Sequence, residues 1–421
     1  MRRVLVIGGS LAGLRTAEAL RAEGYEGDLT ILGDEDEPPY DRPPLSKEVL
    51  TGGCTARQVR LSQRQDLGAT WRLGDAAIGL DPQARIVRTA GGEELRFDGL
   101  VIATGAEPRK LPVFGSVAAP LELRRLGDAL LLRERLLGSS EVTIVGAGFI
   151  GVELASSART LGLGVTLVSL EAPLAAAGAP VSEVITEELR DHGVAMHLGR
   201  GIAAARGATS VEALELDDGK VLATDLLVSA VGVKPATGWL RGSGLDGRLG
   251  VLCDARCRVA GLPGAVAVGD VARREDPRFG ARRIEHWSHA VETARVAARS
   301  LIDKPEPANA RPLVPSFWSE HFGRRLQSVG LPGIADRFEL VEGSLAERRF
   351  VARGLRRGEL VGAVAYGMPA GLVPVRRELS DISRLPRSKK TRALVDVRKG
   401  GDSAESMRRK VGMGRGSWES N

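Results

Sequence analysis

The sequence contains one local pattern twice, and this repeat constrains the fold more than any other feature. Residues 2–32 read as an apolar strand, a glycine-rich turn, a helix and a second apolar strand, and residues 141–168 read the same way. The first glycines of the two turns, Gly8 and Gly146, are 138 residues apart. Units of this kind build parallel sheets with helices packed on their faces. The repeat therefore predicts an α/β chain with two such units.

Both glycine-rich turns have the spacing of dinucleotide-binding sites. In such a turn the first glycine permits a tight bend, the last lets the helix pack closely on the strand, and the helix N-terminus binds a pyrophosphate. The turns read Gly8-Gly9-Ser10-Leu11-Ala12-Gly13, with serine replacing the usual middle glycine, and Gly146-Ala147-Gly148-Phe149-Ile150-Gly151. We therefore expect two Rossmann-like nucleotide-binding domains and two dinucleotides, usually a tightly held FAD and an exchangeable NAD(P)H.

The remaining segments suggest how the chain is divided. Apolar strands that end in small residues follow each unit, at 100–105, 226–232 and 265–270. A region with alternating apolar segments comes after them, and a polar, basic stretch ends the chain. We expect an FAD-binding domain in two parts (1–108 and 236–310), an NAD(P)H-binding domain (109–235), a small α+β C-terminal domain (311–385) and a basic disordered tail (386–421).

Charge is distributed unevenly along the 421 residues. From Arg387 to Asn421 there are ten Lys or Arg and four Asp or Glu, so this stretch alone carries the net charge of +6 found for the whole chain. The rest is neutral, and overall charge gives no reason to expect a nucleic-acid partner. No run approaches the roughly 20 apolar residues of a membrane helix. With a strand beginning at once, no signal peptide is expected, and the expected location is cytoplasmic.

The three cysteines, Cys54, Cys253 and Cys257, form no C-x-x-C pair. Because Cys253 and Cys257 have no matching second pair, neither a disulfide framework nor a metal site is expected. A flavoprotein mechanism that uses a redox-active cysteine pair beside the flavin is disfavoured for the same reason.

Five short motifs make the chain similar to a known family. They are 39–47 (PYDRPPLSK), 103–109 (ATGAEPR), 268–270 (VGD), 285–287 (EHW) and 315–319 (PSFWS). In this order they resemble the single-component ferredoxin reductases of bacterial oxygenase systems, of the putidaredoxin reductase and biphenyl dioxygenase reductase type. The resemblance covers residues 2–380. It implies a glutathione-reductase-like fold and electron transfer from NAD(P)H through FAD to a ferredoxin-type iron–sulfur protein.

The resemblance also implies roles for particular residues. Lys47 places a cation beside the flavin ring and pairs with Glu153, and these two are the expected catalytic residues. Asp270 accepts hydrogen bonds from the flavin ribityl chain, Trp287 and Trp318 lie near the flavin, and the guanidinium groups of Arg42 and Arg109 contact FAD. The other expected cofactor contacts are Ala103, Thr104, Gly105, Gly232, Gly269, Glu285 and His286.

The nucleotide preference is less clear because one position departs from the family pattern. Ser169 stands at the end of the second unit, where a ribose-binding glutamate is expected, and Glu171 follows two residues later. An NADPH site favours a nearby arginine, and residues 169–180 contain none. The sequence thus favours NADH, with NADPH possible. In the first unit, Asp34 or Glu35 is the ribose-binding candidate.

Two other functions fit the same sequence. A rubredoxin reductase or a reductase of quinone-type acceptors would share these motifs, since partner choice depends on the surface. A flavoprotein that senses NADH and acts as an interaction protein is a third possibility. Peroxidase-like and NADH-oxidase relatives are disfavoured because Ser46 stands where they need a cysteine. The sequence leaves the oligomeric state, monomer or dimer, open.

Overall fold

The computed structural model of the protein describes the chain except residues 115–118, 208–209, 246, 309, 311 and 385–421. The basic tail expected at 386–421 lies outside the described residues. Within them the chain is a mixed α/β structure with two five-stranded parallel sheets and one five-stranded antiparallel sheet.

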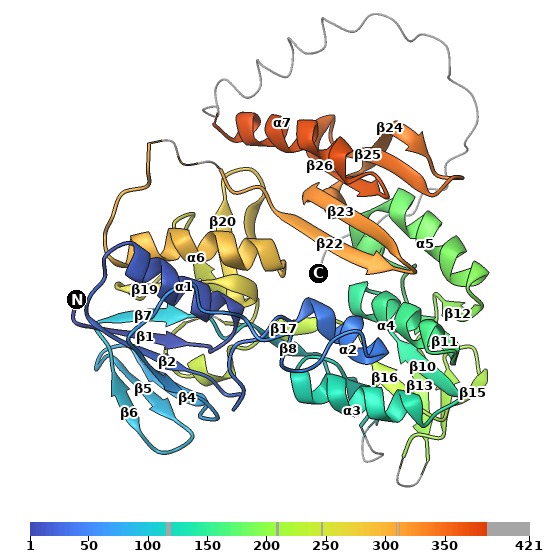
Figure 1. Ribbon diagram of the computed structural model, residues 1–421, viewed down its shortest axis with the longest axis horizontal. Helices are drawn as coiled ribbons and strands as arrows, with labels where there is room; N and C mark the ends of the chain where they lie inside the picture. Colours follow the sequence, from blue (N-terminus) through green and yellow to red (C-terminus); the bar gives the residue numbers. More distant parts are fainter. Residues whose placement is uncertain (115–118, 208–209, 246, 309, 311, 385–421) are drawn as a thin grey trace, which may run out of the picture.

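The first parallel sheet contains strands that precede the second unit in the sequence and one strand that follows it. Its order is β19-β7-β1-β2-β3, and all neighbours run parallel. β19 follows the second unit in sequence, so the chain returns to this sheet after leaving it. Helices α1 and α6 pack against each other on it (Figure 1). The elements are β1 (Arg3–Ile7), α1 (Leu11–Ala22), β2 (Asp28–Leu32), β3 (Ala69–Arg72), β7 (Gly99–Ile102), β19 (Ala265–Ala267) and α6 (Trp287–Leu301).

The second parallel sheet repeats the topology of the first. Its order is β12-β11-β10-β16-β9, and β10 takes the place that β1 has in the first sheet. Its core is formed by buried Val, Ile and Leu side chains of these strands, including Val142, Ile144, Val165, Leu167 and Val228. The elements are β9 (Leu121–Glu122), α3 (Leu126–Leu137), β10 (Glu141–Val145), α4 (Phe149–Thr160), β11 (Gly164–Ser169), α5 (Ala179–Asp191), β12 (Val194–Leu198) and β16 (Leu227–Ser229).

Smaller sheets and turns connect these layers. β8 (Ala106–Pro108) and β17 (Val233–Pro235) pair as an antiparallel link between the two nucleotide-binding units. The 3-10 turn η1 (Pro43–Ser46) and α2 (Glu48–Thr51) lie against α3 and α4. The short sheets are formed by β4 (Ala77–Asp81), β5 (Ile86–Thr89) and β6 (Glu94–Arg96), by β13 (Ile202–Arg206), β14 (Ala213–Leu216) and β15 (Val221–Ala223), and by β18 (Val251–Cys253), β20 (Ala272–Asp276) and β21 (Gly280–Arg283).

The C-terminal part is an antiparallel sheet covered by one helix. Its order is β22-β23-β26-β25-β24, and α7 packs on β23 and β26. β22 lies against α4 and α6, so this part contacts both nucleotide-binding units (Figure 1). The expected fold class, two Rossmann-like domains plus a small α+β domain, is confirmed. The elements are β22 (Ser316–His321), β23 (Arg324–Gly330), β24 (Arg337–Ser344), β25 (Arg349–Arg356), β26 (Glu359–Tyr366) and α7 (Leu372–Arg384).

Candidate cofactor cavity

The first glycine-rich turn is shaped by contacts that only glycine allows. Gly8 has φ +119°, and a Cβ built on it would lie 2.1 Å from the Ala103 carbonyl oxygen. A Cβ on Gly13 would lie 1.9 Å from the Gly8 oxygen. In the second unit, Gly151 and Gly146 repeat that last contact at 1.9 Å. Both turns therefore hold the N-terminus of a helix close to the strand ends, the arrangement that binds a pyrophosphate.

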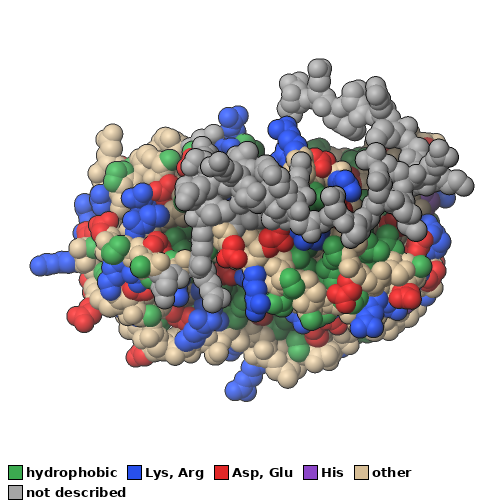
Figure 2. Space-filling view, turned by 90° about the horizontal axis from the view of Figure 1, so that it is seen from above, with side chains coloured by type: hydrophobic (Ala, Val, Ile, Leu, Met, Phe, Trp, Pro, Cys, Tyr) green, Lys and Arg blue, Asp and Glu red, His purple; other side chains and the backbone are tan. Residues whose placement is uncertain are grey.

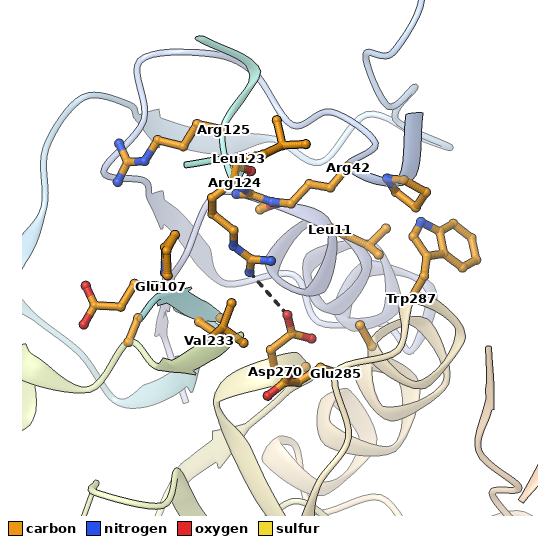
Figure 3. A pocket seen from close by; sticks show the side chains of 18 of the residues that line it. Leu11, Arg42, Glu107, Leu123, Arg124, Arg125, Val233, Asp270, Glu285 and Trp287 are labelled. Atoms are coloured by element: carbon orange, nitrogen blue, oxygen red, sulfur yellow. Dashed lines mark hydrogen bonds and ion pairs between the residues drawn. The ribbon is translucent and has the colours of Figure 1, made fainter. Parts of the chain in front are cut away.

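One cavity of about 740 Å³ begins at the first turn and extends to the second unit. It passes between β1, β7 and η1, reaches Trp287 and Trp318, and includes Phe149 and Glu153 of α4. Figure 3 shows side chains of its wall from α1 (Leu11), from the segment between the two units (Arg42, Glu107 and Arg124) and from the segment after them (Val233, Asp270 and Trp287). The residues expected from the sequence line this cavity except for Gly13, Arg109, Gly146, Gly151, Ser169 and Glu171.

Those exceptions have identifiable places. The three glycines underlie the turns as described above. Arg109 does not line the cavity, because its Nε donates to the Val233 carbonyl at 3.1 Å on the β8–β17 link. Ser169 ends β11 and is 9% exposed, and its hydroxyl accepts a hydrogen bond from the Glu171 backbone N–H at 3.2 Å. Ser169 and Glu171 thus lie together at the carboxyl end of β11, outside the cavity.

The two ribose-binding candidates of the first unit both have cationic partners. Glu35 accepts from Arg42 at 2.6 Å and from the Tyr40 hydroxyl. Burial tends to raise the pKa of Glu35, but Arg42 and Tyr40 outweigh it and leave that pKa below its ordinary value. Asp34 is more exposed and pairs with Arg125. Glu35 is therefore an ionised, oriented acceptor at the cavity wall.

The cavity wall also carries an ion pair that the sequence did not suggest. Arg124 Nη2 lies 3.3 Å from the Asp270 carboxylate (Figure 3). Burial lowers the pKa of Arg124 and raises the pKa of Glu285 beside the pair. The sequence assigned neither Arg124 nor Arg125 to the site. Their position between strand β9 and helix α3 could have indicated a site residue, because a side chain there is held at the end of a strand.

The tryptophans meet at the far end of the cavity. Trp287 and Trp318 stand edge to face with ring centroids 5.8 Å apart. The indole N–H of Trp287 donates to Asp41 at 2.7 Å, and burial raises the pKa of Asp41. Asp41 belongs to the 39–47 motif but was not singled out as a site residue. The motif and the tryptophans therefore share one wall.

Lys47 and Glu153 join the two nucleotide-binding units. Lys47 Nζ lies 2.8 Å from Glu153 Oε2, with the side chains 16% and 7% exposed. The Ser46 hydroxyl donates to the same oxygen at 2.5 Å. A cation is thus held at the cavity by a carboxylate of the other unit.

Sequence comparison places the chain in a family. The pyridine nucleotide-disulphide oxidoreductase model matches residues 2–294, and a reductase C-terminal model matches 316–399. The chain belongs to the pyridine nucleotide-disulphide oxidoreductase family. The cavity fits the FAD that such oxidoreductases use with NAD(H), since the glycine cradle, the helix N-terminus and the polar walls suit a dinucleotide.

Relatives of this oxidoreductase cover nearly all of it. It is 34% identical over 91% of its length, and 95% of the relative, to the 5,5'-dehydrodivanillate O-demethylase ferredoxin reductase subunit of Sphingobium sp.. It is 34% identical over 78%, and 80% of the relative, to the benzene 1,2-dioxygenase system ferredoxin–NAD(+) reductase subunit of Pseudomonas putida. The covalent putidaredoxin reductase–putidaredoxin complex matches with a TM-score of 0.85 and 28% identity, over 95% of this chain and 99% of that one. The resemblance expected from the motifs is confirmed.

The cysteines of this oxidoreductase lie away from the cavity. Cys54 is half-buried, Cys253 and Cys257 are buried, and none of the three lines the cavity in the described structure. Burial raises the pKa of Cys257 to about 12. At the NADH-oxidase cysteine position stands Ser46, with its hydroxyl on Glu153. A thiol mechanism therefore has no group at this site.

The described ranges lack two kinds of feature. They contain no group of three or more His, Cys, Asp or Glu side chains arranged to hold a metal ion. Among the helices of those same residues, none combines the length and apolar character that crossing a membrane requires.

Proposed function

We propose that this oxidoreductase passes electrons from NADH through FAD to a ferredoxin-type iron–sulfur protein that serves an oxygenase. One observation carries the proposal: a single cavity joins the first glycine-rich turn to Gly148, Phe149 and Glu153 at the second. A dinucleotide in the first unit and a nicotinamide held by the second would meet there. The relatives that cover most of the chain are ferredoxin reductases by name, which supports the choice of acceptor.

Each wall of the cavity has a proposed task. The first turn and Glu35 hold the pyrophosphate and ribose of FAD, and Asp270 faces its ribityl chain. When bound, FAD accepts a hydride from a nicotinamide and releases electrons singly. Lys47, held by Glu153, supplies a positive charge that stabilises negative charge developing at the ring. Trp287 and Trp318 exclude water from that end.

We also propose the domain boundaries drawn from the sequence, with the FAD-binding domain in two parts around the NAD(P)H-binding domain. The sheets support them, because β19 joins a sheet whose other strands all precede residue 103. The expected cytoplasmic location is likewise a proposal, which cell fractionation tests.

The charge of the described surface bears on how a ferredoxin would dock. Three pairs of neighbouring arginines, 124–125, 324–325 and 376–377, could form a basic patch, but at least one arginine of each pair has an acidic partner. Arg124 pairs with Asp270, Arg324 with Glu188 and Arg376 with Glu292. Figure 2 shows basic and acidic side chains interspersed over the coloured part of the face seen from above. We therefore expect a weakly charged docking surface near the tryptophans rather than a strong basic one.

The deciding experiment measures electron transfer from NADH with the purified flavoprotein. A [2Fe–2S] ferredoxin, a rubredoxin and a small quinone are compared as acceptors at physiological salt. Fast NADH-dependent reduction of the ferredoxin supports the proposal. Preference for rubredoxin or quinone would favour a rubredoxin reductase or a reductase of quinone-type acceptors instead. Flavin that is reduced by NADH but passes electrons to none of the three would favour the NADH-sensing interaction protein.

A further inference from the structure

The Glu153 carboxylate is held by donors from two other parts of the chain. Its Oε2 accepts from Lys47 at 2.8 Å and from Ser46 at 2.5 Å, both in the 39–47 motif. Its Oε1 accepts from the hydroxyl of Ser319, which belongs to β22 in the C-terminal sheet. Glu153 itself lies on α4 of the second unit. The orientation of this carboxylate is therefore fixed partly by a domain that contributes neither glycine-rich turn.

The hydrogen-bond directions can be assigned from the donor inventory. A carboxylate only accepts, and a serine hydroxyl has one hydrogen. Since Ser319 gives its hydrogen to Glu153, the 2.9 Å contact between Ser319 Oγ and His321 Nε2 requires the hydrogen to be on Nε2. His321 thus donates to Ser319, and Ser319 donates to Glu153.

The surroundings of His321 favour the neutral ring with its hydrogen on Nε2. It is 1% exposed, and burial lowers its pKa to about 4, so it is neutral near pH 7. Its Nδ1 has no hydrogen-bond partner in the described chain, which agrees with the unprotonated nitrogen of that tautomer. The next residue, Phe322, donates its backbone N–H to Ser156 of α4 at 2.8 Å. β22 is therefore fixed to the helix that carries Glu153.

We infer that Ser319 and His321 are positioning residues for the Lys47–Glu153 pair. His321 orients the Ser319 hydroxyl, Ser319 fixes the second oxygen of Glu153, and Glu153 then holds Lys47 at the cavity. The inference rests on the proposed function, because the cation has a task only if FAD is bound beside it. It makes the C-terminal domain a determinant of the flavin environment.

The test measures the flavin midpoint potential and the single-turnover rate of flavin reduction by NADH in purified holoprotein. Ser319→Ala and His321→Leu should lower the potential and slow reduction about tenfold, as expected for one lost charge-assisted hydrogen bond. His321→Gln keeps an N–H donor near the Nε2 position and should restore most of both values. Ser328→Ala, a buried serine on neighbouring β23 with no partner in the described structure, is the matched control and should change neither.

A double-mutant cycle separates positioning from general structural damage. In a Lys47→Met background, Ser319→Ala should have no further effect on the potential. An undiminished effect there, or a Ser319→Ala protein equal to Ser328→Ala, would overturn the inference. If Ser319→Ala does not fold, the inference is tested by comparing the flavin potential and reduction rate of His321→Leu with those of His321→Gln. An unaltered chain that binds no FAD, or whose flavin NADH does not reduce, refutes the proposed function instead.

Discussion

Arg124 and Asp270, 146 residues apart in the sequence, form a 3.3 Å ion pair within the wall of the cofactor cavity. Arg124 precedes α3, and Asp270 follows β19 in the turn η5 (Gly269–Val271). The charges of this ion pair also act on the Glu285 carboxyl. Burial raises the pKa of Glu285 above its ordinary value, and Asp270 adds to this rise, whereas Arg283 and Arg124 reduce it. The guanidinium thus offsets two carboxyl groups in a cavity proposed to receive an anionic dinucleotide.

We predict that Arg124→Gln weakens FAD binding about tenfold or more, because the substitution leaves Asp270 without its cation. Titration of apoprotein with FAD and the flavin content after gel filtration measure this. Arg353→Gln is the control, since Arg353 pairs with Glu378 in the C-terminal part of the chain and does not line the cavity. Equal FAD affinity in both variants would show that Arg124 does not support the cofactor.

What the sequence predicted well is local. Gly8 and Gly13 could be assigned because a tight turn and a close helix–strand approach leave characteristic residues at fixed spacing. Lys47 and Glu153 came from the family resemblance, and the structure brings them to 2.8 Å. Arg124 was missed because its partner is distant in sequence, and no local pattern encodes that contact. Arg109 was expected at FAD from the 103–109 motif and its forked guanidinium. Its Nε donates to the Val233 carbonyl, and the FAD contact stays a prediction.

A second prediction concerns the Trp287–Asp41 hydrogen bond. Trp287→Phe keeps an aromatic ring but removes the indole N–H that donates to Asp41 at 2.7 Å. The free energy of unfolding should fall by about 1 kcal/mol, the cost of a partly buried acceptor losing its donor. Urea denaturation of the apoprotein measures it. Trp318→Phe leaves that bond intact, and a larger loss there would assign the stabilisation to ring packing instead.

The third prediction concerns the ion pair between the two units. Lys47→Met should slow flavin reduction by NADH while FAD remains bound, because the cation that stabilises the reduced flavin is removed. Glu153→Ala should give a smaller defect of the same kind, since Lys47 remains but loses its anchor. Stopped-flow absorbance with saturating NADH checks both. Wild-type rates in both variants would remove these residues from the mechanism.

The fourth prediction is a loss of stability in mild acid. Burial lowers the pKa of His286 to about 4, of His289 to about 3 and of His321 to about 4. Above pH 6.5 these residues are neutral in both the folded and the unfolded chain. As the pH falls below that value the unfolded chain takes up protons first, so each histidine lowers the unfolding free energy by up to about 1.4 kcal/mol per pH unit.

Urea midpoints measured from pH 7 to pH 4 test this. The decline should begin near the ordinary histidine pKa and continue to pH 4, because the pKa values of these histidines in the folded chain are about 4 or lower. His289→Gln, chosen because His289 does not line the cavity, should make the decline shallower. An unchanged slope would mean that His289 is protonated in the folded protein.

The last prediction concerns the nicotinamide nucleotide. Ser169 ends β11, where the ribose of a bound nucleotide is expected, and supplies no carboxylate. The structure adds a residue that the sequence window 169–180 could not include. The backbone N–H of Arg200 donates to the Ser169 carbonyl at 3.2 Å, while its guanidinium lies 3.1 Å from Asp218. An arginine therefore lies at this edge, but acidic side chains already neutralise it.

We accordingly predict a preference for NADH over NADPH that is real but weak. Ser169→Glu should sharpen it about tenfold, because a carboxylate accepts hydrogen bonds from the ribose hydroxyls and repels a 2′-phosphate. Arg200→Gln should change NADPH use little if Asp218 retains the guanidinium, and should reduce it if the arginine turns toward the phosphate. The ratio of kcat/KM for the two nucleotides measures both effects. A Ser169→Glu protein that uses NADPH as well as the unaltered chain does would show that Ser169 does not face the ribose, and would place nucleotide selection elsewhere along the edge of the second sheet.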